Sequence, residues 1–223
     1  MSTGPKQALY SEFALVARAL GSPHRLEMIE HLAQGERGVE ALSKQVRLSV
    51  ANTSQHLQQL RRAGLVASRR DGKFIRYRLA DDAILGLTGM LSNVAERNLA
   101  EVERIRRSYF EVRDSMEAVS RDELMSRMRD GLITILDVRP ADEFATGHLP
   151  GAVNVPFSEL EEQLGQFDPT SEIVAYCRGP WCVLSFEAVA VLRARGFSAR
   201  RLEDGLPEWK ASGLPVDRRG ISN

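Results

Sequence analysis

The stretch that most constrains the fold is a strand-to-helix turn that holds both cysteines of the chain, Cys177 and Cys182. The apolar run 172–176 before it is typical of a buried strand, and the spacing of apolar residues over 185–192 is helical, closing at Gly196. A strand that passes into a helix in this way is typical of an α/β sheet, and such sheets bind ligands at the carboxyl ends of their strands. The sequence therefore predicts an α/β domain with a candidate site at Cys177.

Cys177 lies where a helix N-terminus offers free N–H groups and about half a positive charge. A thiol in such a place loses its proton more easily than a free cysteine, so we interpret Cys177 as the catalytic nucleophile. The alternative is a small buried hydrophobe, but Gly179 and Pro180 after it are residues that build loops. We expect an anion-binding loop made of Arg178, Gly179, Pro180, Trp181, Cys182, Val183 and Leu184.

Strand and helix patterns alternate on both sides of this turn. The predicted elements are helices over 121–128, 141–145 and 206–211, and strands over 132–139, 152–155 and 199–202. Together with the cysteine turn they predict a compact α/β domain with a mostly parallel sheet.

The two halves of the chain carry opposite charge, although the whole chain of 223 residues is neutral. Residues 1–113 hold 18 Lys and Arg against 12 Asp and Glu, whereas residues 114–223 hold 12 against 18. This length fits one large domain or two small ones, and the charge asymmetry favours two. The basic half is the candidate for binding nucleic acid.

The basic half is mainly helical and contains the pattern of a helix-turn-helix. A short helix is predicted over 39–46, and Ser49 is the N-cap of a second helix that stops at Gly64. This second helix directs polar side chains outward, as reading base edges in a major groove requires. The predicted DNA contacts on it are Ser49, Asn52, Ser54, Gln55 and Gln58, with Gln59 also outward and Arg62 near phosphate.

The residues after this helix predict a β-hairpin, because Asp71-Gly72 separates two alternating segments. Basic residues cluster around its tip, as in a wing that binds phosphate. The alternative is a solvated edge hairpin whose charges prevent aggregation. With the preceding helices in view, we interpret it as a DNA-binding wing with contacts from Arg69, Arg70, Lys73 and Arg76.

Residues 10–80 resemble the ArsR-type winged-helix repressors. The resemblance is carried by Leu48-Ser49, by Ser54-Gln55-His56-Leu57 and by the run from Leu60 to Val66. It implies a homodimer that binds a partly palindromic double-stranded DNA operator and releases it when an inducer is sensed. Many members of the family sense metals through a cysteine motif on the third helix, whereas residues 39–46 contain no cysteine. We therefore expect no metal site and no cofactor.

Residues 83–119 lie between the two halves, contain no proline and place apolar residues at mostly helical spacing. The pattern predicts one long helix or two in line. Its apolar surface exceeds what its own domain can cover, so we assign it to the dimer interface and to the connection between the halves.

The acidic half resembles a rhodanese domain over residues 120–217. The resemblance implies transfer of a sulfane sulfur through a persulfide on Cys177, with backbone N–H groups holding the anion. We interpret Asp137, Arg139 and His148 as supporting residues that tie loops together. The matching motifs are Asp137-Val138-Arg139, Glu143-Phe144, Gly147 to Ala152, Asn154, Pro156, Tyr176-Cys177, Gly205 to Trp209 and Gly213 to Val216.

The cysteine loop departs from the pattern of that family. Ordinary sulfurtransferases of this type begin the following helix with Ser-x-x-Ala six residues after the cysteine, whereas the matching Ser185 and Ala188 put it at eight. A loop that is two residues longer would accept a larger donor than thiosulfate, or would let Cys182 resolve an adduct on Cys177.

These expectations define a winged helix-turn-helix domain over 1–82, a long dimerisation helix over 83–119 and a rhodanese-like domain over 120–223. The leading hypothesis is a transcriptional repressor whose partners are operator DNA, a second copy of the chain and a small sulfur donor or oxyanion. Two alternatives stay open: a thiosulfate or persulfide sulfurtransferase with a dimerising winged helix, and a thiol redox or oxyanion sensor using Cys177 and Cys182. No segment has the length and apolarity of a membrane span, so we expect a cytoplasmic protein.

Overall fold

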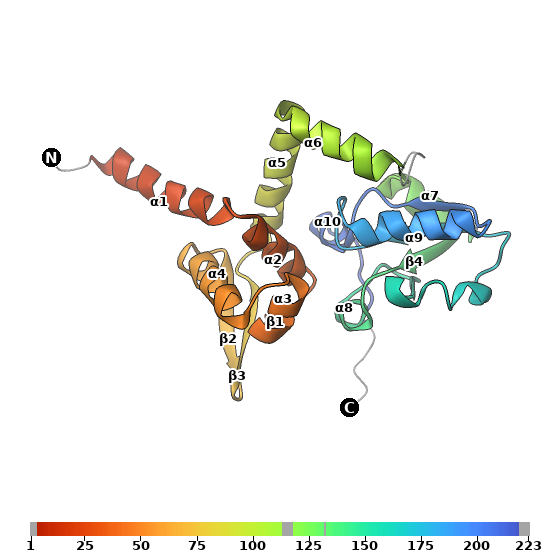
Figure 1. The fold of residues 1–223 in the computed structure, drawn as a ribbon, viewed down its shortest axis with the longest axis horizontal. Coiled ribbons are helices and arrows are strands. Elements are labelled where there is room, and N and C mark those ends of the chain that lie inside the picture. The colour runs from red at the N-terminus through yellow and green to blue at the C-terminus, as the bar shows by residue number, and fades with distance from the viewer. Residues whose placement is uncertain (1–3, 113–117, 132, 219–223) are drawn as a thin grey trace. The chain divides into compact units, whose positions relative to one another are not determined.

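The computed structural model describes residues 4–112, 118–131 and 133–218, and the chain divides into two compact units, Met1–Gly89 and Met90–Asn223 (Figure 1). No helix in these ranges is long and apolar enough to cross a membrane. The first unit is mainly helical with a small antiparallel sheet, and the second packs helices on a parallel sheet. The predicted fold class is therefore confirmed.

The first unit is built on the helices α1 (Pro5–Leu20), α2 (Pro23–Ala33), α3 (Val39–Gln45) and α4 (Val50–Arg62). Leu57 and Leu60 of α4 are fully buried, in one cluster with Met28 of α2 and Leu42 of α3. The apolar residues on the inner face of α4 recur at three- and four-residue steps, so one side of the helix enters the core and the opposite side stays polar. This packing holds α3 and α4 as a helix-turn-helix.

The turn before α4 has the predicted cap. The Ser49 side chain accepts a hydrogen bond from the Asn52 backbone N–H at 3.2 Å. Arg47 has a φ of 53°, a left-handed conformation that reverses the chain between the two helices. Gly64, with a φ of 72°, directs the chain out of α4 and into the hairpin.

The described part of this unit contains a three-stranded antiparallel sheet in the order β1 (Arg37–Gly38), β3 (Phe74–Leu79), β2 (Val66–Asp71). The sequence pattern places Asp71 and Gly72 at the hairpin turn, but Asp71 pairs with Phe74, so Gly72 and Lys73 form the turn. Gly72 has a φ of 61°, which suits the first central position of a type II′ turn. The strand β1 was missed because a two-residue strand leaves no periodic pattern.

The segment 83–119, predicted as one long helix or two in line, contains a break. The chain forms α5 (Ala83–Asn98), then α6 (Ala100–Ile105), and continues as a π-helix, η1 (Arg106–Glu111). Leu99 between α5 and α6 is extended, with φ −111° and ψ 107°, so the segment contains two helices with a break and not one continuous helix. The part of the prediction over 113–117 lies outside the described residues.

The second unit contains a parallel sheet, which over the described residues runs β5 (Val153–Asn154), β4 (Ile133–Asp137), β6 (Glu172–Tyr176), β7 (Ala199–Arg201). Asp137 of β4 pairs with Tyr176 of β6, so the two central strands end level with each other. Cys177 follows β6 directly and lies at this carboxyl edge, where open α/β sheets bind their ligands. Leu132, the first residue of the predicted strand, lies outside the described residues.

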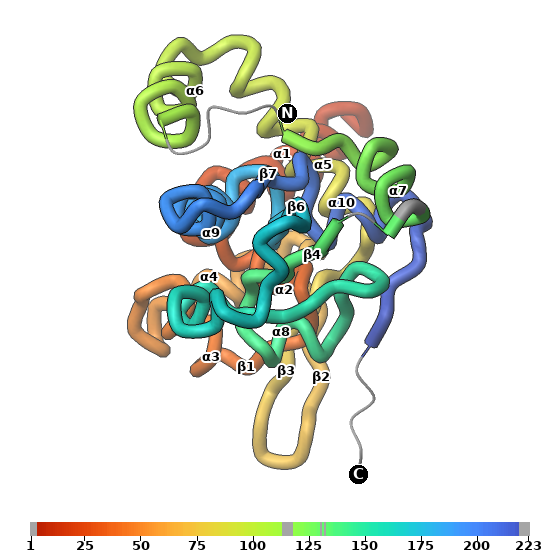
Figure 2. Tube along the Cα trace, turned by 90° about the vertical axis from the view of Figure 1, so that its right-hand side faces the viewer, coloured from red at the N-terminus to blue at the C-terminus, as the bar shows by residue number. Residues whose placement is uncertain are grey.

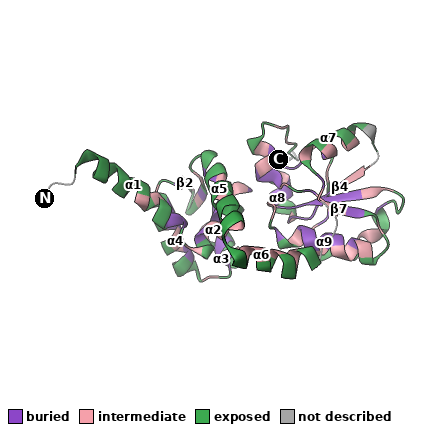
Figure 3. Cartoon of the chain, turned by 90° about the horizontal axis from the view of Figure 1, so that it is seen from above, coloured by how far each residue is buried: buried purple, intermediate pink, exposed green. Residues whose placement is uncertain are grey.

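Helices cover both faces of this sheet: α7 (Arg121–Asp130), α8 (Ala141–Thr146), α9 (Val183–Ala194) and α10 (Leu206–Ala211), with short 3-10 turns η2 (Phe157–Glu159) and η3 (Leu164–Gln166). Ile173 of β6 belongs to the core cluster that includes residues of α9, and its neighbour Val174 belongs to the cluster with residues of α7 and α10. Figures 2 and 3 show α9 on one side of the strands and α7 on the other. The alternation explains why β6 reads as a continuous apolar run.

Candidate functional site

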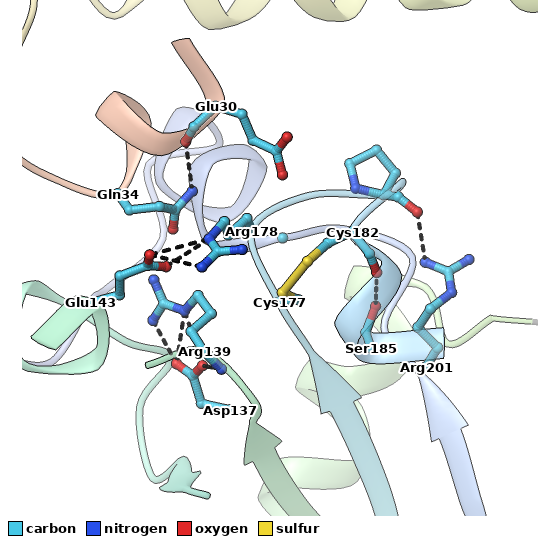
Figure 4. The surroundings of a disulfide bond; sticks show 12 residues. Glu30, Gln34, Asp137, Arg139, Glu143, Cys177, Arg178, Cys182, Ser185 and Arg201 are labelled. Atoms are coloured by element: carbon cyan, nitrogen blue, oxygen red, sulfur yellow. Dashed lines mark hydrogen bonds and ion pairs between the residues drawn. A yellow bond between two sulfur atoms is a disulfide. The ribbon is translucent and has the colours of Figure 1, made fainter. Parts of the chain in front are cut away.

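The cysteine loop closes a ring at the carboxyl edge of the sheet. Cys177 follows β6, Cys182 is the N-cap of α9, and their sulfurs are joined in a disulfide (Figure 4). The two Cα atoms are 6.1 Å apart, within the range usual for disulfides. Cys177 is 1% and Cys182 6% exposed, among apolar residues of the core on the α9 side.

The loop is shorter than predicted, because it ends at Cys182. Val183 and Leu184, expected in the anion-binding loop, form the first turn of α9. The Ser185 hydroxyl donates to the Cys182 carbonyl at 2.9 Å, which places Ser185 inside that turn and not before it. The Ser-x-x-Ala pattern therefore does not mark the helix start, and the loop consists of residues 178–182.

In the structure the cysteine at the helix N-terminus is Cys182 and not Cys177. Cys182 caps the 12-residue α9, whose first N–H groups favour a nearby thiolate. Cys177 lies at the other end of the loop, beyond β6. The order in which the two reduced thiols react stays a prediction.

Gly205 and α10 hold the loop from outside. An ideal Cβ on Gly205 would lie 2.3 Å from the backbone nitrogen of Gly179 and 2.4 Å from the carbonyl carbon of Arg178. Leu206 at the start of α10 donates its N–H to the Cys177 carbonyl at 3.3 Å. Only a residue without a side chain permits this approach, so the Gly205 position fixes the path of the loop.

Glu208 lies beside the same loop. Its carboxylate accepts the Gly205 N–H at 3.0 Å, and a Cβ on Gly179 would lie 3.8 Å from the other carboxylate oxygen. Burial raises the pKa of the Glu208 carboxyl, against the opposing effect of backbone N–H groups that donate to it. Sequence reasoning missed Glu208 as a site residue, although it lies in the motif from Gly205 to Trp209.

Arg178, the first residue of the loop, is engaged by Glu143 of α8. The guanidinium Nε and Nη2 each donate to the Glu143 carboxylate at 2.9 Å, in the two-pronged geometry that Arg favours (Figure 4). The loop is thereby tied to α8 as well as to α10. Glu143 was missed as a site residue, and the Glu143-Phe144 motif was the signal that pointed to it.

A buried network joins the ends of β4 and β6. Asp137 and Arg139 form a fully buried ion pair, and Arg139 also donates to the Gly147 carbonyl at 2.9 Å. The Tyr176 hydroxyl donates to Asp137 and accepts the Leu149 N–H at 3.1 Å. Burial, and next the Asp137 carboxylate, raise the pKa of Tyr176 well above its ordinary value, so the hydroxyl keeps its proton. The network ties the turn over 147–149 to the sheet.

His148 lies in that turn. Its Nδ1 is 2.9 Å from the Phe144 carbonyl oxygen, and the two rings stack with centroids 3.7 Å apart. Its backbone exchanges hydrogen bonds of 2.9 Å with Asp217. These contacts are those of a residue that anchors a loop. Across the ranges given above, no group of three or more His, Cys, Asp or Glu side chains is placed to hold a metal ion.

Trp181 links the cysteine loop to the connecting helices. Its ring centroid lies 5.4 Å from that of Phe110 in η1, and Phe110 lies 4.7 Å from Phe186 of α9. A cavity of about 250 Å³ adjoins this contact, lined by Trp181 and by residues of α5, α6 and η1. A displacement of Trp181 would therefore change the packing of η1 and α6.

The helix α4 presents a polar surface. Asn52 and Gln55 are exposed, and Ser54 and Gln58 are half-buried. Thr53 points into the core with Leu57 and Leu60, as the predicted inner face requires.

Arg25 of α2 fixes α4 from inside, and sequence reasoning missed it. Its guanidinium donates to the Gln59 side chain at 2.5 Å and to the Arg18 carbonyl at 2.9 Å. Gln59, expected among the outward residues, is exposed and is also held by this contact to the body of the domain. A single arginine between His24 and Leu26 gave no pattern from which this role could be derived.

The cations of the wing differ in their surroundings. Arg69 pairs with Glu36 at 2.7 Å and Arg76 with Asp71 at 3.2 Å, whereas Lys73 lies in the turn at the tip. Exposed pairs of this kind contribute little, so the arginines can exchange a carboxylate for a phosphate at small cost. The other expected phosphate contacts, Arg62 and Arg70, are exposed.

Comparison with known proteins finds a match for each half of the chain. The sequence family described as bacterial regulatory protein, arsR family, matches residues 22–68, and the rhodanese-like domain matches residues 120–212. The HTH-type transcriptional regulator Rv0324 of Mycobacterium tuberculosis is 40% identical over 213 residues, which cover 95% of this chain and 93% of that protein.

Two solved structures match the halves separately. The homodimeric winged helix-turn-helix DNA-binding domain Mb0332 of Mycobacterium bovis is 35% identical, with a TM-score of 0.41, over 44% of this chain and 92% of that one. A rhodanese-related protein of Thermoplasma volcanium is 25% identical, with a TM-score of 0.43, over 47% of this chain and 100% of that one. Because the identity to the mycobacterial regulator extends through both halves, the chain belongs to the arsR family of bacterial transcriptional regulators and carries a rhodanese-like domain behind its winged helix-turn-helix.

Proposed function

We propose that this protein is a repressor that binds operator DNA as a homodimer and senses reactive sulfur through Cys177 of its rhodanese-like domain. The observation that carries the proposal is the loop itself, which holds both cysteines and packs its Trp181 against Phe110 of η1. A chemical change at the sulfurs thus has a path to the segment that follows the winged helix. The protein acts in the cytoplasm, where bacterial operator DNA lies.

The polar face of α4 supports sequence-specific DNA binding. Asn52 and Gln55 are exposed, and such amide side chains read adenine through paired hydrogen bonds in the major groove. Lys73 at the tip of the wing reaches phosphate without contributing to sequence choice. The assignment gives α4 the base contacts and the hairpin the backbone contacts.

Apolar side chains that the single chain leaves exposed support the homodimer. Leu87, Leu91 and Val94 recur along one side of α5 and are each exposed by two-fifths or more of their surface. Leu9 and Phe13 of α1 are likewise exposed. Stripes of this kind are buried when a second copy packs on them, which also sets the spacing of the two recognition helices.

The position of Cys177 supports its role as the sulfur-carrying atom. It lies at the carboxyl edge of the sheet, and its sulfur is bonded to that of Cys182, the N-cap of α9, so an anionic sulfur on Cys177 would lie beside the N-terminus of that helix. The ties of the loop to Glu143, Gly205 and Leu206 keep this cradle in one shape.

A second candidate is a thiol redox sensor, and the disulfide between Cys177 and Cys182 favours it. In that case a general oxidant such as peroxide closes the ring directly. Sulfane sulfur would then weaken DNA binding no more effectively than a general oxidant.

Operator titrations separate the two candidates. The purified, reduced full chain should bind its operator, and treatment with glutathione persulfide should weaken binding for the wild type but not for Cys177→Ser. Peroxide that weakens operator binding at a concentration no higher than that of persulfide would identify the redox sensor. Failure of the reduced protein to bind any footprinted site would overturn the repressor.

A further inference from the structure

We infer that the cysteine loop reduces the sulfur it takes up: Cys182 discharges a persulfide on Cys177 as hydrosulfide and closes the disulfide present in the structure. The inference rests on the proposed function and specifies its chemistry. The lasting signal is then a disulfide, and the persulfide is an intermediate on the way to it.

The sulfur of Cys182 and the outer sulfur of a persulfide compete for one bonding position on Cys177 Sγ. A divalent sulfur such as Cys177 Sγ bonds to its own Cβ and to one further atom, which in the structure is Cys182 Sγ. The outer sulfur of a persulfide would take that same position, so persulfide and disulfide exclude each other. With the Cα atoms 6.1 Å apart and the loop held by Gly205, Cys182 stays within reach of Cys177.

Uptake is an exchange at sulfur. The Cys177 thiolate attacks the outer sulfur of a low-molecular-weight persulfide, and a bond forms between that sulfur and Cys177 Sγ. The sulfur–sulfur bond of the donor breaks, and the donor thiolate leaves with the electron pair. The outer sulfur keeps its oxidation state in this step.

Discharge is a second exchange. The Cys182 thiolate attacks Cys177 Sγ, the bond between the two cysteines forms, and the bond to the outer sulfur breaks. The outer sulfur leaves with the electron pair and, with a proton, becomes hydrosulfide. Two cysteine thiols are oxidised by one electron each, and the outer sulfur is reduced by two.

The placement of the thiols favours discharge within the loop over transfer to an outside acceptor. Cys182 is adjacent to Cys177 in the same loop, so its attack is intramolecular, whereas an outside acceptor must first diffuse to the persulfide. As the N-cap of α9, Cys182 is also the thiol whose ionisation the helix favours. The neighbouring thiol is thus the best nucleophile available to the persulfide.

Return to the starting state requires an external thiol. Two low-molecular-weight thiols reduce the disulfide, and they leave as one oxidised disulfide. The net reaction turns one persulfide and two thiols into one donor thiol, one hydrosulfide and one disulfide. The loop is therefore a thiol-dependent persulfide reductase that turns over once when no thiol is added.

The test treats the reduced full chain, freed of reductant, with glutathione persulfide and measures intact mass and released sulfide together. Wild type should become lighter by two hydrogens and release one sulfide per chain above the Cys177→Ser background. Cys182→Ser should become heavier by one sulfur atom and release none above that background. Peroxide should give the wild-type disulfide without sulfide.

Wild type that retains the extra sulfur, or that closes its disulfide without releasing sulfide, would overturn the inference whether or not Cys182→Ser folds. The proposed function is judged separately by the operator titration. If a stable persulfide forms and still weakens operator binding, only the discharge step is refuted. If sulfide is released and operator binding does not change, the discharge step is supported and the sensor is refuted.

Discussion

Gly205 lies against the peptide that joins Arg178 to Gly179 so closely that a Cβ on it would stand 2.3 Å from the Gly179 nitrogen. The same glycine donates its N–H to Glu208, and the next residue, Leu206, donates to the Cys177 carbonyl. The loop that carries both cysteines is thus shaped by the segment that begins α10.

Gly205→Ala tests this contact. Its methyl group meets backbone atoms that no rotamer change can move, so the loop or α10 must shift, at about 1–3 kcal/mol for an overpacked site. We expect a lower thermal unfolding midpoint and slower persulfide uptake. Gly165→Ala is the matched control, because a Cβ there meets nothing within 4 Å. Equal effects of the two substitutions would refute the role of Gly205.

Glu208→Gln tests the carboxyl beside the loop through pH. Burial raises the folded-state pKa of Glu208 above its unfolded value, so ionisation costs more in the folded protein. The stability present below the unfolded pKa is lost as pH rises through the folded pKa. The unfolding midpoint of Glu208→Gln relative to wild type should therefore increase from pH 4 to pH 7. The exposed Glu162→Gln is the control, and profiles parallel to wild type for both variants would contradict the prediction.

Local patterns were sufficient for most of the fold. The strand 172–176 and the helix 206–211 were predicted with their observed bounds, because apolar periodicity and the flanking Gly205 define them. The sequence allowed one long helix or two over 83–119 but did not place the break at Leu99, since a single extended residue between two helical patterns changes no periodicity. Propensity does not report where a helix changes direction.

The site was harder to predict, because its contacts join distant parts of the sequence. Cys177 and Cys182 were identified by type and spacing, but the start of α9 at Val183 was placed too late, at the Ser185 pattern. The bond from Arg178 to Glu143 spans 35 residues, and no periodic pattern extends over such a distance. The motifs identified the segments that form the site, but they did not indicate which side chains contact each other.

Gln55→Ala and Lys73→Ala test the division of labour at the DNA interface. Loss of an exposed amide on α4 should relax base preference at one operator position by about 1–3 kcal/mol. Loss of the cation in the wing should weaken binding to all sequences and lower the salt slope by about one. Titrations of matched and mutated operators at several salt concentrations measure both effects. A change in sequence preference from Lys73→Ala, with none from Gln55→Ala, would reverse the assignment.

Leu91→Glu tests the homodimer. A carboxylate in the middle of the exposed apolar stripe of α5 would lose its hydration in an interface, so the variant should shift to monomer in sedimentation. Met125→Glu on α7 is the matched control, since it introduces the same charge at an exposed apolar helical position away from that stripe. A dimer that tolerates Leu91→Glu would place the interface elsewhere.

Trp181→Ala tests how the state of the sulfurs reaches DNA. The first unit contains no cysteine, and we expect a signal from the loop to travel through the connecting helices, with the Trp181 contact to Phe110 as its first step. A coupling of about 1–3 kcal/mol would make the operator affinities of the reduced and disulfide forms differ by about 5–150-fold. Trp181→Ala should bring the operator titration curves of the reduced and disulfide forms together, and Trp181→Phe should restore part of their separation.

The control is Phe197→Ala, which removes an aromatic contact to Phe167 with centroids 6.4 Å apart and should leave the separation intact. If wild-type curves for the two forms coincide, the domains are fused without coupling; if the separation survives Trp181→Ala, the signal takes another path.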